Sequence, residues 1–451
     1  MILISISSFS QSHISVMSDR YSGFYGTTLN PTSFISSPID TEINVFGLDF
    51  ELESDYGYIK NSSYLDLPST FSNLKITNPY IENEIDDLSF NIFEKKDPYT
   101  ILSSVLISGP SYIFKVKETN KIYSYGLGIN QRINLSALKF NSGYNYNNFR
   151  KENFGNEILF DDTNSGVIGA NWTELKFNFS TSRKKNDSFI ESIGFNFKIN
   201  IPYTSLQINQ ESPTKMIYQN LETLIFFNDF STESKFYTNT AIFKKRGLGL
   251  SLDLGYSIYK KKAQSKKRDE YVYKLGISVL DLGFLNFNNL SEVHKYDIFG
   301  PRNLDIEDVK NYKDMSERVY GDRDRSFVKA SYNIYTPLSL SVQFDYNFYK
   351  SLYFNTTILN RLNFGDDFLK RSNILNSSVR IEKREYSIIL NGSFYEYKKI
   401  SLGLSSRIGP LIFSINNISN MFHKSDKLNH VELMIGLKAY QFYKKPFYCK
   451  C

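Results

Sequence analysis

Residues 248–258 read LGLSLDLGYSI, and this stretch decides the fold. From Leu248 to Ile258, every even position holds Leu, Tyr or Ile, whereas every odd position holds Gly, Ser or Asp. Successive side chains of a β-strand point to opposite faces of the sheet, so this alternation predicts a strand with one apolar face and one small or polar face. Residues 192–203 and 338–348 alternate in the same way.

Strand length favours a membrane barrel over a soluble sandwich. The three stretches span 11 or 12 residues, whereas soluble strands average about five to six residues and a tilted strand needs about nine to eleven to cross a bilayer. Their polar faces contain Lys198, Asp253 and Asp345, which the core of a sandwich would tolerate poorly. A wet lumen accepts these residues while the apolar face meets lipid.

Less regular alternation extends through most of the chain. We therefore predict an all-β fold, a closed antiparallel transmembrane β-barrel of about 14–16 strands over residues 20–442. Candidate strands lie at 41–54, 111–118, 121–133, 164–172, 174–183, 187–203, 235–245, 247–259, 270–281, 326–336, 337–350, 351–362, 373–383, 384–396, 398–408, 409–418 and 428–442. Very short turns, such as Thr336-Pro337, join several of them, as expected at one end of a barrel.

The composition suits a barrel. The chain has 451 residues, beyond the usual size of one soluble core, but a barrel grows around its circumference instead. Only 41% of the residues are hydrophobic and the mean hydropathy is -0.34, which a barrel tolerates because half of each strand is polar. The 33 Tyr and 37 Phe residues favour strands and the aromatic girdles of membrane barrels.

Charge and hydropathy exclude other classes. The net charge of +6 is mild and the charged residues are spread along the chain, so nucleic-acid binding is not predicted. The basic cluster at 260–268 lies between two predicted strands, and we interpret it as a solvated hairpin loop in preference to a contact with lipopolysaccharide or a partner. No run of 18 apolar residues occurs, so no transmembrane helix is predicted.

Both ends of the chain differ from the barrel pattern. Residues 1–11 resemble the end of a secretory signal that lacks its charged start, and we expect residues 1–19 to be a signal remnant or a disordered start. Cys449 and Cys451 are too close together for an ordinary disulfide and too few for a structural zinc site. Residues 443–451 are therefore predicted to be a C-terminal tail.

Three internal stretches break the alternation. Residues 61–109 are polar with an acidic centre, residues 144–163 are typical of a long exposed loop, and residues 288–325 contain a charged, helix-like run. Such segments form extracellular loops or fold into a barrel as a plug. We expect residues 61–109 to be plug or loop elements.

No enzyme motif stands out. The four His residues form no His-Glu-x-x-His zinc motif, and neither a nucleophile elbow nor a phosphate-binding glycine loop occurs. His430 and Glu432 are expected to face the lumen, where a neighbouring serine would complete a hydrolase triad only through the folded geometry. We predict a non-enzyme without catalytic residues, metal or cofactor, and a barrel-embedded hydrolase is the weakest alternative.

Charged residues on the polar faces of the strands are candidates for the lumen lining. If the pore is open, they would bias the passage of ions or polar solutes, but we favour pairing with each other or with a plug, since charges in a confined lumen need partners. These lumen-facing candidates are Lys198, Asp253, Asp345, Arg407, His430, Glu432 and Lys438.

Several short blocks resemble a family of uncharacterised Bacteroidota outer-membrane β-barrels. The blocks are Tyr21-Ser22-Gly23, Leu29-Asn30-Pro31, Gly109-Pro110-Ser111, the stretch 275–283 (LGISVLDLG), Arg407-Ile408-Gly409-Pro410 and Asn416-Asn417-Ile418. Two features depart from the family pattern. Thr32 stands where Ala is usual, and nine residues follow Phe442 although such barrels usually end in an aromatic residue.

That family is distantly similar to the long-chain fatty-acid transporter barrels, which share an Asn-Pro element in an N-terminal plug, and to shuttle barrels of type IX secretion. The resemblance implies that residues 20–40 lie inside the lumen and that hydrophobic molecules have a lateral route. From the residues alone, Asn30-Pro31 is a turn, because a residue before proline avoids helix. Asp281 either caps a turn at a strand end, which we favour, or docks the plug.

These observations give two main functional hypotheses. The first is a bacterial outer-membrane barrel, surrounded by membrane lipid and lipopolysaccharide, that passively passes or binds small or hydrophobic molecules. The alternative is a plugged barrel that acts as a scaffold or partner-binding component of a secretion or surface-glycan system.

Overall fold

A computed structural model describes most of the chain. The described residues are 14–66, 90–94, 98–118, 121–144, 154–160, 165–219, 223–227, 229–238, 247–262, 270–288, 291–305, 309 and 311–442. Residues 1–13 of the expected signal remnant or disordered start (1–19) and the expected tail at 443–451 lie outside these residues.

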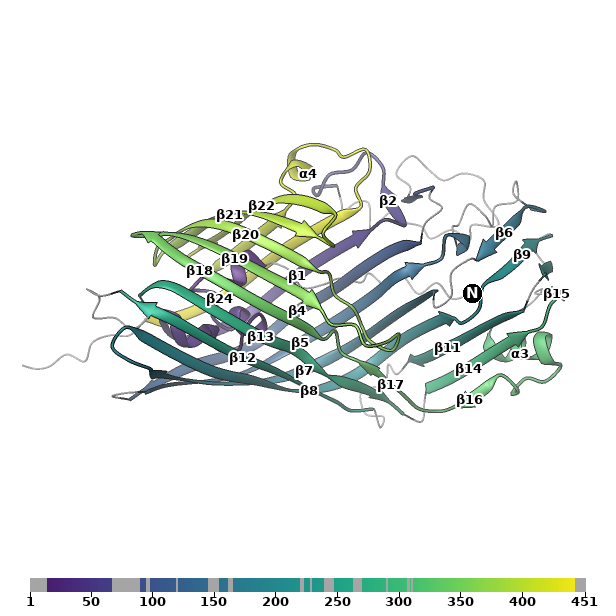
Figure 1. Ribbon diagram of the computed structural model, residues 1–451, viewed down its shortest axis with the longest axis horizontal. Helices are drawn as coiled ribbons and strands as arrows, with labels where there is room; N and C mark the ends of the chain where they lie inside the picture. The colour runs from purple at the N-terminus through teal and green to yellow at the C-terminus, as the bar shows by residue number, and fades with distance from the viewer. Residues whose placement is uncertain are drawn as a thin grey trace, which may run out of the picture.

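Fourteen antiparallel strands of the described chain close into a barrel (Figure 1). Closure follows from β1, which pairs with β24 on one side and with β4 on the other. The predicted closed barrel is confirmed, and its strand number lies within the predicted range. The strands are β1 (Ile39–Ser54), β4 (Tyr99–Lys117), β5 (Lys121–Phe140), β7 (Ser165–Lys184), β8 (Phe189–Gln210), β12 (Gly249–Lys261), β13 (Tyr271–Phe287), β18 (Ser339–Tyr349), β19 (Leu352–Arg361), β20 (Ile374–Glu382), β21 (Tyr386–Tyr395), β22 (Lys399–Ile408), β23 (Leu411–Asn416) and β24 (His430–Phe442).

The two faces of the barrel wall differ as the alternation predicts. On β12, Leu254 is 47% exposed on the outside, whereas its neighbour Asp253 is fully buried on the inside. An apolar outer face on a closed sheet without free edges is the structure that a bilayer requires. The chain is thus an all-β barrel of the bacterial outer membrane.

No described helix has the length and apolar character needed to span a membrane.

One end of the barrel has short turns and the other has long connections. Residues 185–188 join β7 to β8, and residues 350–351 join β18 to β19, at the same end as the start of β1 and the end of β24. Short turns mark the periplasmic end of such barrels and long loops the extracellular end. The described part of the basic cluster, Lys260–Lys262, therefore lies at the periplasmic end, away from lipopolysaccharide.

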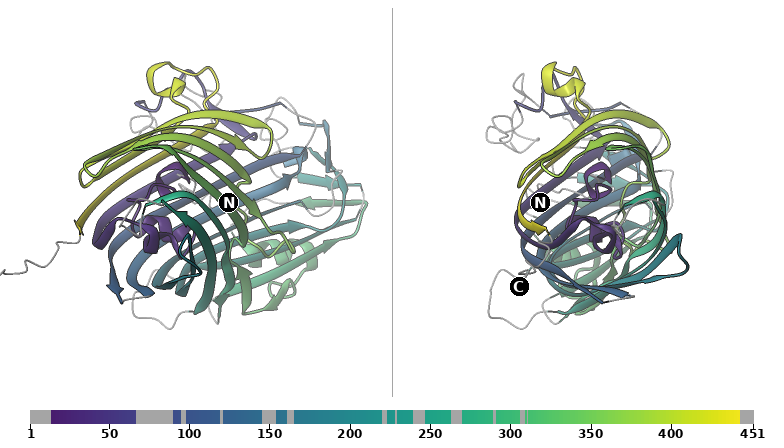
Figure 2. Two further views of the ribbon diagram at one scale, coloured as in Figure 1. Left: turned by 60° about the vertical axis from the view of Figure 1, so that its left-hand side comes forward. Right: turned by 90° about the vertical axis from the view of Figure 1, so that its left-hand side faces the viewer.

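The N-terminal segment lies inside the barrel at this end, as Figure 2 shows along the barrel axis. It contains α1 (Ile14–Met17), η1 (Tyr25–Thr28) and η2 (Ser33–Ser36), and we call residues 14–38 the plug. The expected position inside the lumen is confirmed. Residues 14–19, which were expected to belong to a signal remnant or disordered start, are part of the plug instead. The apolar side chains of Ile14, Val16 and Met17 are buried there.

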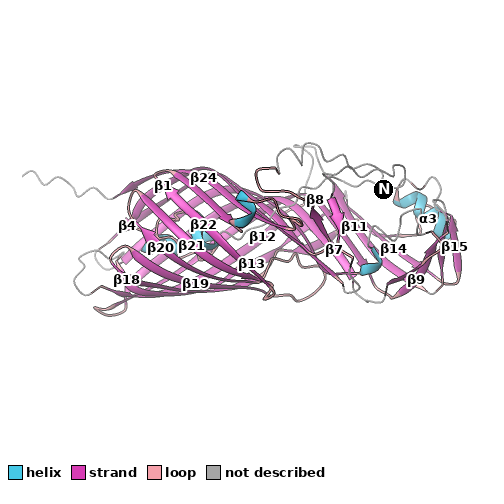
Figure 3. Ribbon diagram, turned by 90° about the horizontal axis from the view of Figure 1, so that it is seen from above, coloured by secondary structure: helices cyan, strands magenta, loops and turns pink. Residues whose placement is uncertain are grey.

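The wall is much taller on one side, so that the molecule is elongated (Figure 3). Strands β4, β5, β7 and β8 have 19 to 22 residues, whereas β19 to β22 have 9 or 10. Further strands lengthen the tall side: β11 (Phe230–Thr238), β14 (Ser291–Ile298), β16 (Phe327–Lys329) and β17 (Tyr332–Tyr335). They continue β12, β13 and β18 toward the extracellular end.

The extracellular connections fold into small structures of their own. β6 (Glu157–Phe160), β9 (Thr214–Tyr218), β10 (Thr223–Phe226) and β15 (Arg302–Asp305) form a separate sheet with α3 (Tyr312–Tyr320) beside it. This extracellular sheet has its own apolar core, which includes Phe160, Phe226 and Val319. The remaining elements are β2 (Gly57–Ile59), β3 (Phe90–Ile92), η3 (Ser142–Tyr144) and α4 (Ser419–Phe422).

Three predicted loop stretches contain more regular structure than expected. Residues 99–109, predicted as part of a plug or loop, form the extracellular half of β4; Leu102, Ser103, Val105 and Leu106 are all buried. A strand that is covered on both faces has no alternation to detect. The stretch 144–163 contains β6, and 288–325 contains β14 and β15 besides the expected helix, α3.

Candidate functional site

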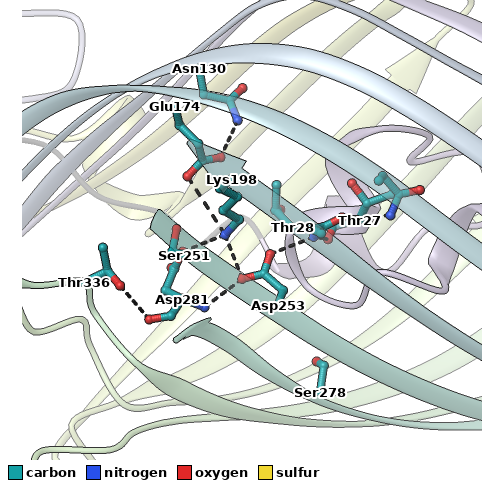
Figure 4. A network of polar contacts seen from close by, with 12 residues as sticks. Thr27, Thr28, Asn130, Glu174, Lys198, Ser251, Asp253, Ser278, Asp281 and Thr336 are labelled. Carbon is teal, nitrogen blue, oxygen red and sulfur yellow. Dashed lines mark hydrogen bonds and ion pairs between the residues drawn. The ribbon is translucent and has the colours of Figure 1, made fainter. Parts of the chain in front are cut away.

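A network of buried ion pairs crosses the middle of the lumen (Figure 4). Lys198 Nζ on β8 donates to Asp253 Oδ1 on β12 and to Asp281 Oδ1 on β13, at 2.7 Å each. Arg132 on β5 donates to Asp281 (2.7 and 3.0 Å) and to Glu174 on β7 (3.1 Å). Together with Arg371, these residues form the central ion-pair network. Buried charges need partners of opposite sign because they are removed from water, and the network provides these partners.

A β-bulge places Asp281 in this network. Leu252 pairs with Leu282 and Leu254 with Val279, so both Leu280 and Asp281 lie opposite Asp253 alone. Asp281 has a φ of 56°, and both Leu280 and Asp281 are buried inside the barrel. The bulge lets two successive side chains face the lumen. β13 continues to Phe287, so Asp281 lies within the strand and not at the predicted strand end.

The network is linked to the plug through asparagine side chains of the wall. Asn196 Nδ2 donates to Thr27 O of the plug (2.8 Å) and to Asp253 Oδ2 (2.7 Å). Asn178 Nδ2 donates to Pro31 O (3.1 Å). Asn30 Oδ1 accepts a hydrogen bond from Thr32 N (3.0 Å), and Asn30 Nδ2 donates to Gln343 Oε1 (3.0 Å). The predicted turn residues Asn30 and Pro31 thus both contact the wall.

Two sets of ion pairs hold the plug nearer the periplasmic end. Arg20 donates to Glu382 on β20 (2.5 Å), which also accepts from Arg380 (2.9 Å). Arg380 contacts Asp345 as well (2.6 Å). Beside the plug, a cavity of about 40 Å³ is lined in part by Lys274, Gln343 and Asp345. It has room for about one or two water molecules.

On the opposite side of the plug, Lys438 on β24 donates to Glu42 (3.1 Å) and to the carbonyl oxygen of Tyr21. Arg407 on β22 lies 3.6 Å from Asp19 and stacks over the Tyr21 ring at 4.4 Å. The predicted lumen-facing residues Arg407 and Lys438 therefore contact the plug.

His430 and Glu432 lie together near the extracellular end of β24. His430 Nδ1 is 2.7 Å from Glu53 Oε2, and its Nε2 is 4.0 Å from Glu432. Glu432 accepts from Tyr395 and Asn416. In the described residues, no serine hydrogen-bonds His430, and no group of three His, Cys, Asp or Glu side chains is arranged to bind a metal ion. The geometry required for the hydrolase alternative is not present there.

An extracellular loop also folds into the lumen, which the sequence did not indicate. Residues 362–373, which join β19 to β20, form this strap. Arg371 of the strap contacts Asp281 of the central network, and Ser372 donates to Glu51 on β1 (2.6 Å). Asp367 accepts from Gln207 (2.8 Å) and Lys235 (2.6 Å).

Main-chain bonds fix the strap to the tall side of the wall. Leu369 N donates to Tyr335 O (2.9 Å), and Tyr335 N donates to Asp367 O (2.9 Å). Asn134 Nδ2 donates to Lys370 O (3.2 Å), and Lys370 N donates to Ser136 (3.2 Å). The strap therefore lies in the extracellular half of the lumen, as the plug lies in the periplasmic half.

Under the strap lies a buried cluster of apolar and aromatic residues, which we call the aromatic cluster. Its ring contacts include Tyr237 with Phe287 (5.0 Å) and Phe287 with Tyr332 (5.2 Å). Leu369 of the strap packs into it. The full cluster is Ile168, Ala170, Trp172, Tyr237, Leu285, Phe287, Val293, Tyr332, Ile334 and Leu369.

The outer wall carries an apolar groove of about 600 Å³, the wall groove. It lies over a β-bulge at Gly109 and Pro110 of β4, where the register with β5 shifts. Gly128 of β5 also lines it; a Cβ there would come within 2.5 Å of Phe24 of the plug. The full lining is Ile43, Pro110, Ser111, Tyr112, Leu127, Gly128, Ile129, Leu175, Lys176, Phe177, Phe197 and Ile199. The groove thus lies directly outside the wall against which the plug packs.

Comparisons with known proteins identify a family and a group of barrels. The model of a family described as "Family of unknown function (DUF5723)" matches residues 44–416. No curated protein matches the chain.

Three solved structures illustrate the likeness. A deletion mutant of the TodX monoaromatic hydrocarbon channel is 8% identical, with a TM-score of 0.46 and 97% of each chain covered. A Pseudomonas aeruginosa FadL homologue is 10% identical, with a TM-score of 0.45, over 97% of this chain and all of that one. The Ralstonia pickettii toluene transporter TbuX is 8% identical, with a TM-score of 0.42, over 93% and 94%.

Proposed function

Since the chain belongs to the family of unknown function DUF5723, its role has to come from its own residues, and we propose that it admits small hydrophobic molecules through the side of its wall. The observation that carries the proposal is the wall groove. Its lining is mostly apolar, its volume is about 600 Å³, and it opens toward lipid. Pockets for small ligands are of this size and composition.

A side route agrees with the way in which the plug is held. Wall side chains bind the plug on several sides, through Asn196, Glu382 and Lys438. A molecule that travels straight along the axis would have to break these bonds. At the groove, by contrast, the plug meets the wall through the Phe24 ring, which packs against the backbone of Gly128 and lies 4.5 Å from Lys176 Nζ. An apolar molecule loses nothing by replacing one apolar contact with another.

Filling the groove tests this proposal. Ile129→Trp adds bulk in the groove, and Ile388→Trp on β21 is the matched control, since the two isoleucines are 47% and 48% exposed on the outer face. We expect several-fold slower uptake of N-phenyl-1-naphthylamine into proteoliposomes for Ile129→Trp and no change for Ile388→Trp. Equal uptake by the two variants, both folded by heat-modifiability on gels, would refute the side route.

The extracellular sheet favours a second function, the presentation of a surface to a secretion or surface-glycan partner. Three separate chain segments build it, and its apolar core around Phe160 and Phe226 is completed by Tyr296 and Ile298 of β14. Under this alternative, replacing residues 299–326 by a short Gly-Ser linker would abolish co-purification of a partner and leave hydrophobic uptake unchanged.

A further inference from the structure

The inner face of the barrel changes character along its axis. In the membrane-spanning half, many inward residues are polar, such as Asn178, Asn196 and Ser257. That is the usual lining of an outer-membrane barrel. In the extracellular half, the aromatic cluster occupies the inside instead, with Trp172, Leu285 and Phe287 all fully buried. Apolar wall residues of the membrane-spanning half, such as Leu280 and Leu359, pack against the plug. The aromatic cluster contains no plug residue and requires another explanation.

Only one member of the aromatic cluster comes from outside the wall strands. Leu369 belongs to the strap, is 2% exposed and projects among residues of β7, β11, β13, β14 and β17. The strap residues that flank it remain close to water: Phe364 is 71% exposed, and the Asp367 side chain is 45% exposed. Arg371 and Ser372 of the strap are buried as well, but polar contacts with Asp281 and Glu51 hold them. The apolar contact of the strap with the aromatic cluster is thus the Leu369 side chain alone, which a competing apolar molecule can replace.

The aromatic cluster also holds an unused hydrogen-bond donor. Trp172 is fully buried, yet its Nε1 has no hydrogen-bond partner in the described part of the chain. Buried donors are nearly always paired, so Trp172 Nε1 is available to a ligand that offers an acceptor. Arg132 of the central network lies over the Trp172 ring at 5.0 Å, which joins the cluster to the network.

We propose that the aromatic cluster is a luminal binding site for a small apolar molecule with one hydrogen-bond acceptor, and that Leu369 fills this site when the molecule is absent. The acceptor would take the hydrogen bond of Trp172 Nε1, and the apolar body would replace the Leu369 side chain. The strap is then an internal competitor that leaves when a ligand binds. This inference rests on the proposed function and gives the molecule a site inside the lumen.

Trp172 is the single tryptophan of the chain, so its fluorescence tests the proposal on the unaltered protein. Cyclohexanol has an acceptor oxygen, whereas methylcyclohexane has a similar size without one. We expect cyclohexanol to shift the Trp172 emission saturably and with at least tenfold higher affinity than methylcyclohexane. An emission that stays constant with both probes, or changes linearly without saturation, overturns the proposal.

Cysteine labelling tests the release of the strap. In a Cys449→Ser, Cys451→Ser background, Leu369→Cys reports the strap, and Leu285→Cys, in the same cluster on β13, is the matched control. We expect saturating cyclohexanol to speed maleimide labelling of Leu369→Cys at least tenfold and to leave Leu285→Cys slow. Equal acceleration at both positions would mean general loosening and would overturn the proposal, as would no acceleration at either.

The side route and the luminal site can be refuted independently of each other. Neither assay measures uptake, so normal uptake without a response of Trp172 or of the strap removes only the luminal site. A saturable response together with unchanged uptake in Ile129→Trp removes only the side route.

Discussion

The plug and the strap enter the same lumen from opposite ends, but they differ in how fully they are buried. The plug is mostly buried and is bound on several sides, through carbonyl oxygens that accept from Asn178 and Asn196 and through the ion pair of Arg20 with Glu382. The strap is also bound through its main chain, through the Leu369 side chain and through the charges of Asp367 and Arg371, but its residues 363–366 are exposed. A segment with fewer buried residues opens at a lower free-energy cost, so the strap is the closure that can be undone more easily.

The central ion-pair network lies between the two closures, and its loss should have the largest effect. Asp281→Ala would leave Arg132, Lys198 and Arg371 buried without their shared carboxylate. Removing one partner from a buried pair costs about 3–5 kcal/mol. We expect a loss of this size in the free energy of unfolding, measured by guanidinium titration of the barrel in detergent.

The control for this prediction is Asp305→Ala. Asp305 pairs with Arg318 at 3.3 Å on the exposed surface, where ion pairs contribute about 0–1 kcal/mol. If both substitutions changed the free energy of unfolding equally, the central network would contribute no more to stability than an exposed ion pair.

A pair of cavity-forming substitutions compares the two closures directly. Leu369→Ala in the strap should cost about 2–5 kcal/mol and Phe24→Ala in the plug about 3–5 kcal/mol. We expect trypsin to cut the strap of Leu369→Ala at Lys370 or Arg371, whereas Arg20 in the plug of Phe24→Ala stays protected by its hydrogen bonds to Glu382. Rapid cleavage at Arg20 would show that the plug is no more firmly held than the strap.

The smallest expected effect is that of pH on the strap. Burial raises the pKa of Asp367, but hydrogen bonds from Lys235 and Gln207 and the nearby charges of Lys235 and Lys329 outweigh it and lower this pKa below its ordinary 3.8. A carboxyl group with a lowered pKa stabilises docking above the ordinary value and loses that contribution as pH falls through the lowered one.

We therefore expect a Trp172 emission that is constant from neutral pH to about pH 4 and changes below it. Asp367→Asn removes the titrating carboxyl and should flatten this acid transition. An unaltered transition in Asp367→Asn would show that Asp367 does not cause it.

The wall was predictable from sequence because lipid imposes a local pattern. The stretch 248–258 lies in β12 almost as predicted, and the candidate strands 164–172 and 174–183 merge into β7. The pattern fails where lipid no longer covers one face. The extracellular half of β4 is buried on both sides, and β14 continues β13 beyond the membrane-spanning part of the wall.

For the interior, the sequence predicted which residues face the lumen but not which of them contact one another. Alternation indicates that Lys198, Asp253 and Asp345 face the lumen, but it cannot indicate their partners, which are 35 to 83 residues away in the chain. The strap shows this limit most clearly. Arg371 meets Asp281, 90 residues away, and the sequence 362–373 (LNFGDDFLKRSN) is that of an ordinary polar loop. Trp172 likewise gives no local sign that it belongs to a luminal cluster.

The bulge at Asp281 changes which residues of the alternating pattern face lipid. Before it, odd-numbered residues of β13 face lipid (Leu275, Ile277, Val279); after it, even-numbered residues do so (Leu282, Phe284). A relative that lacks one residue here would turn its lipid-facing side chains inward unless a compensating insertion restored the phase. Residue-by-residue alignments of this family should therefore be anchored separately on the two sides of this point.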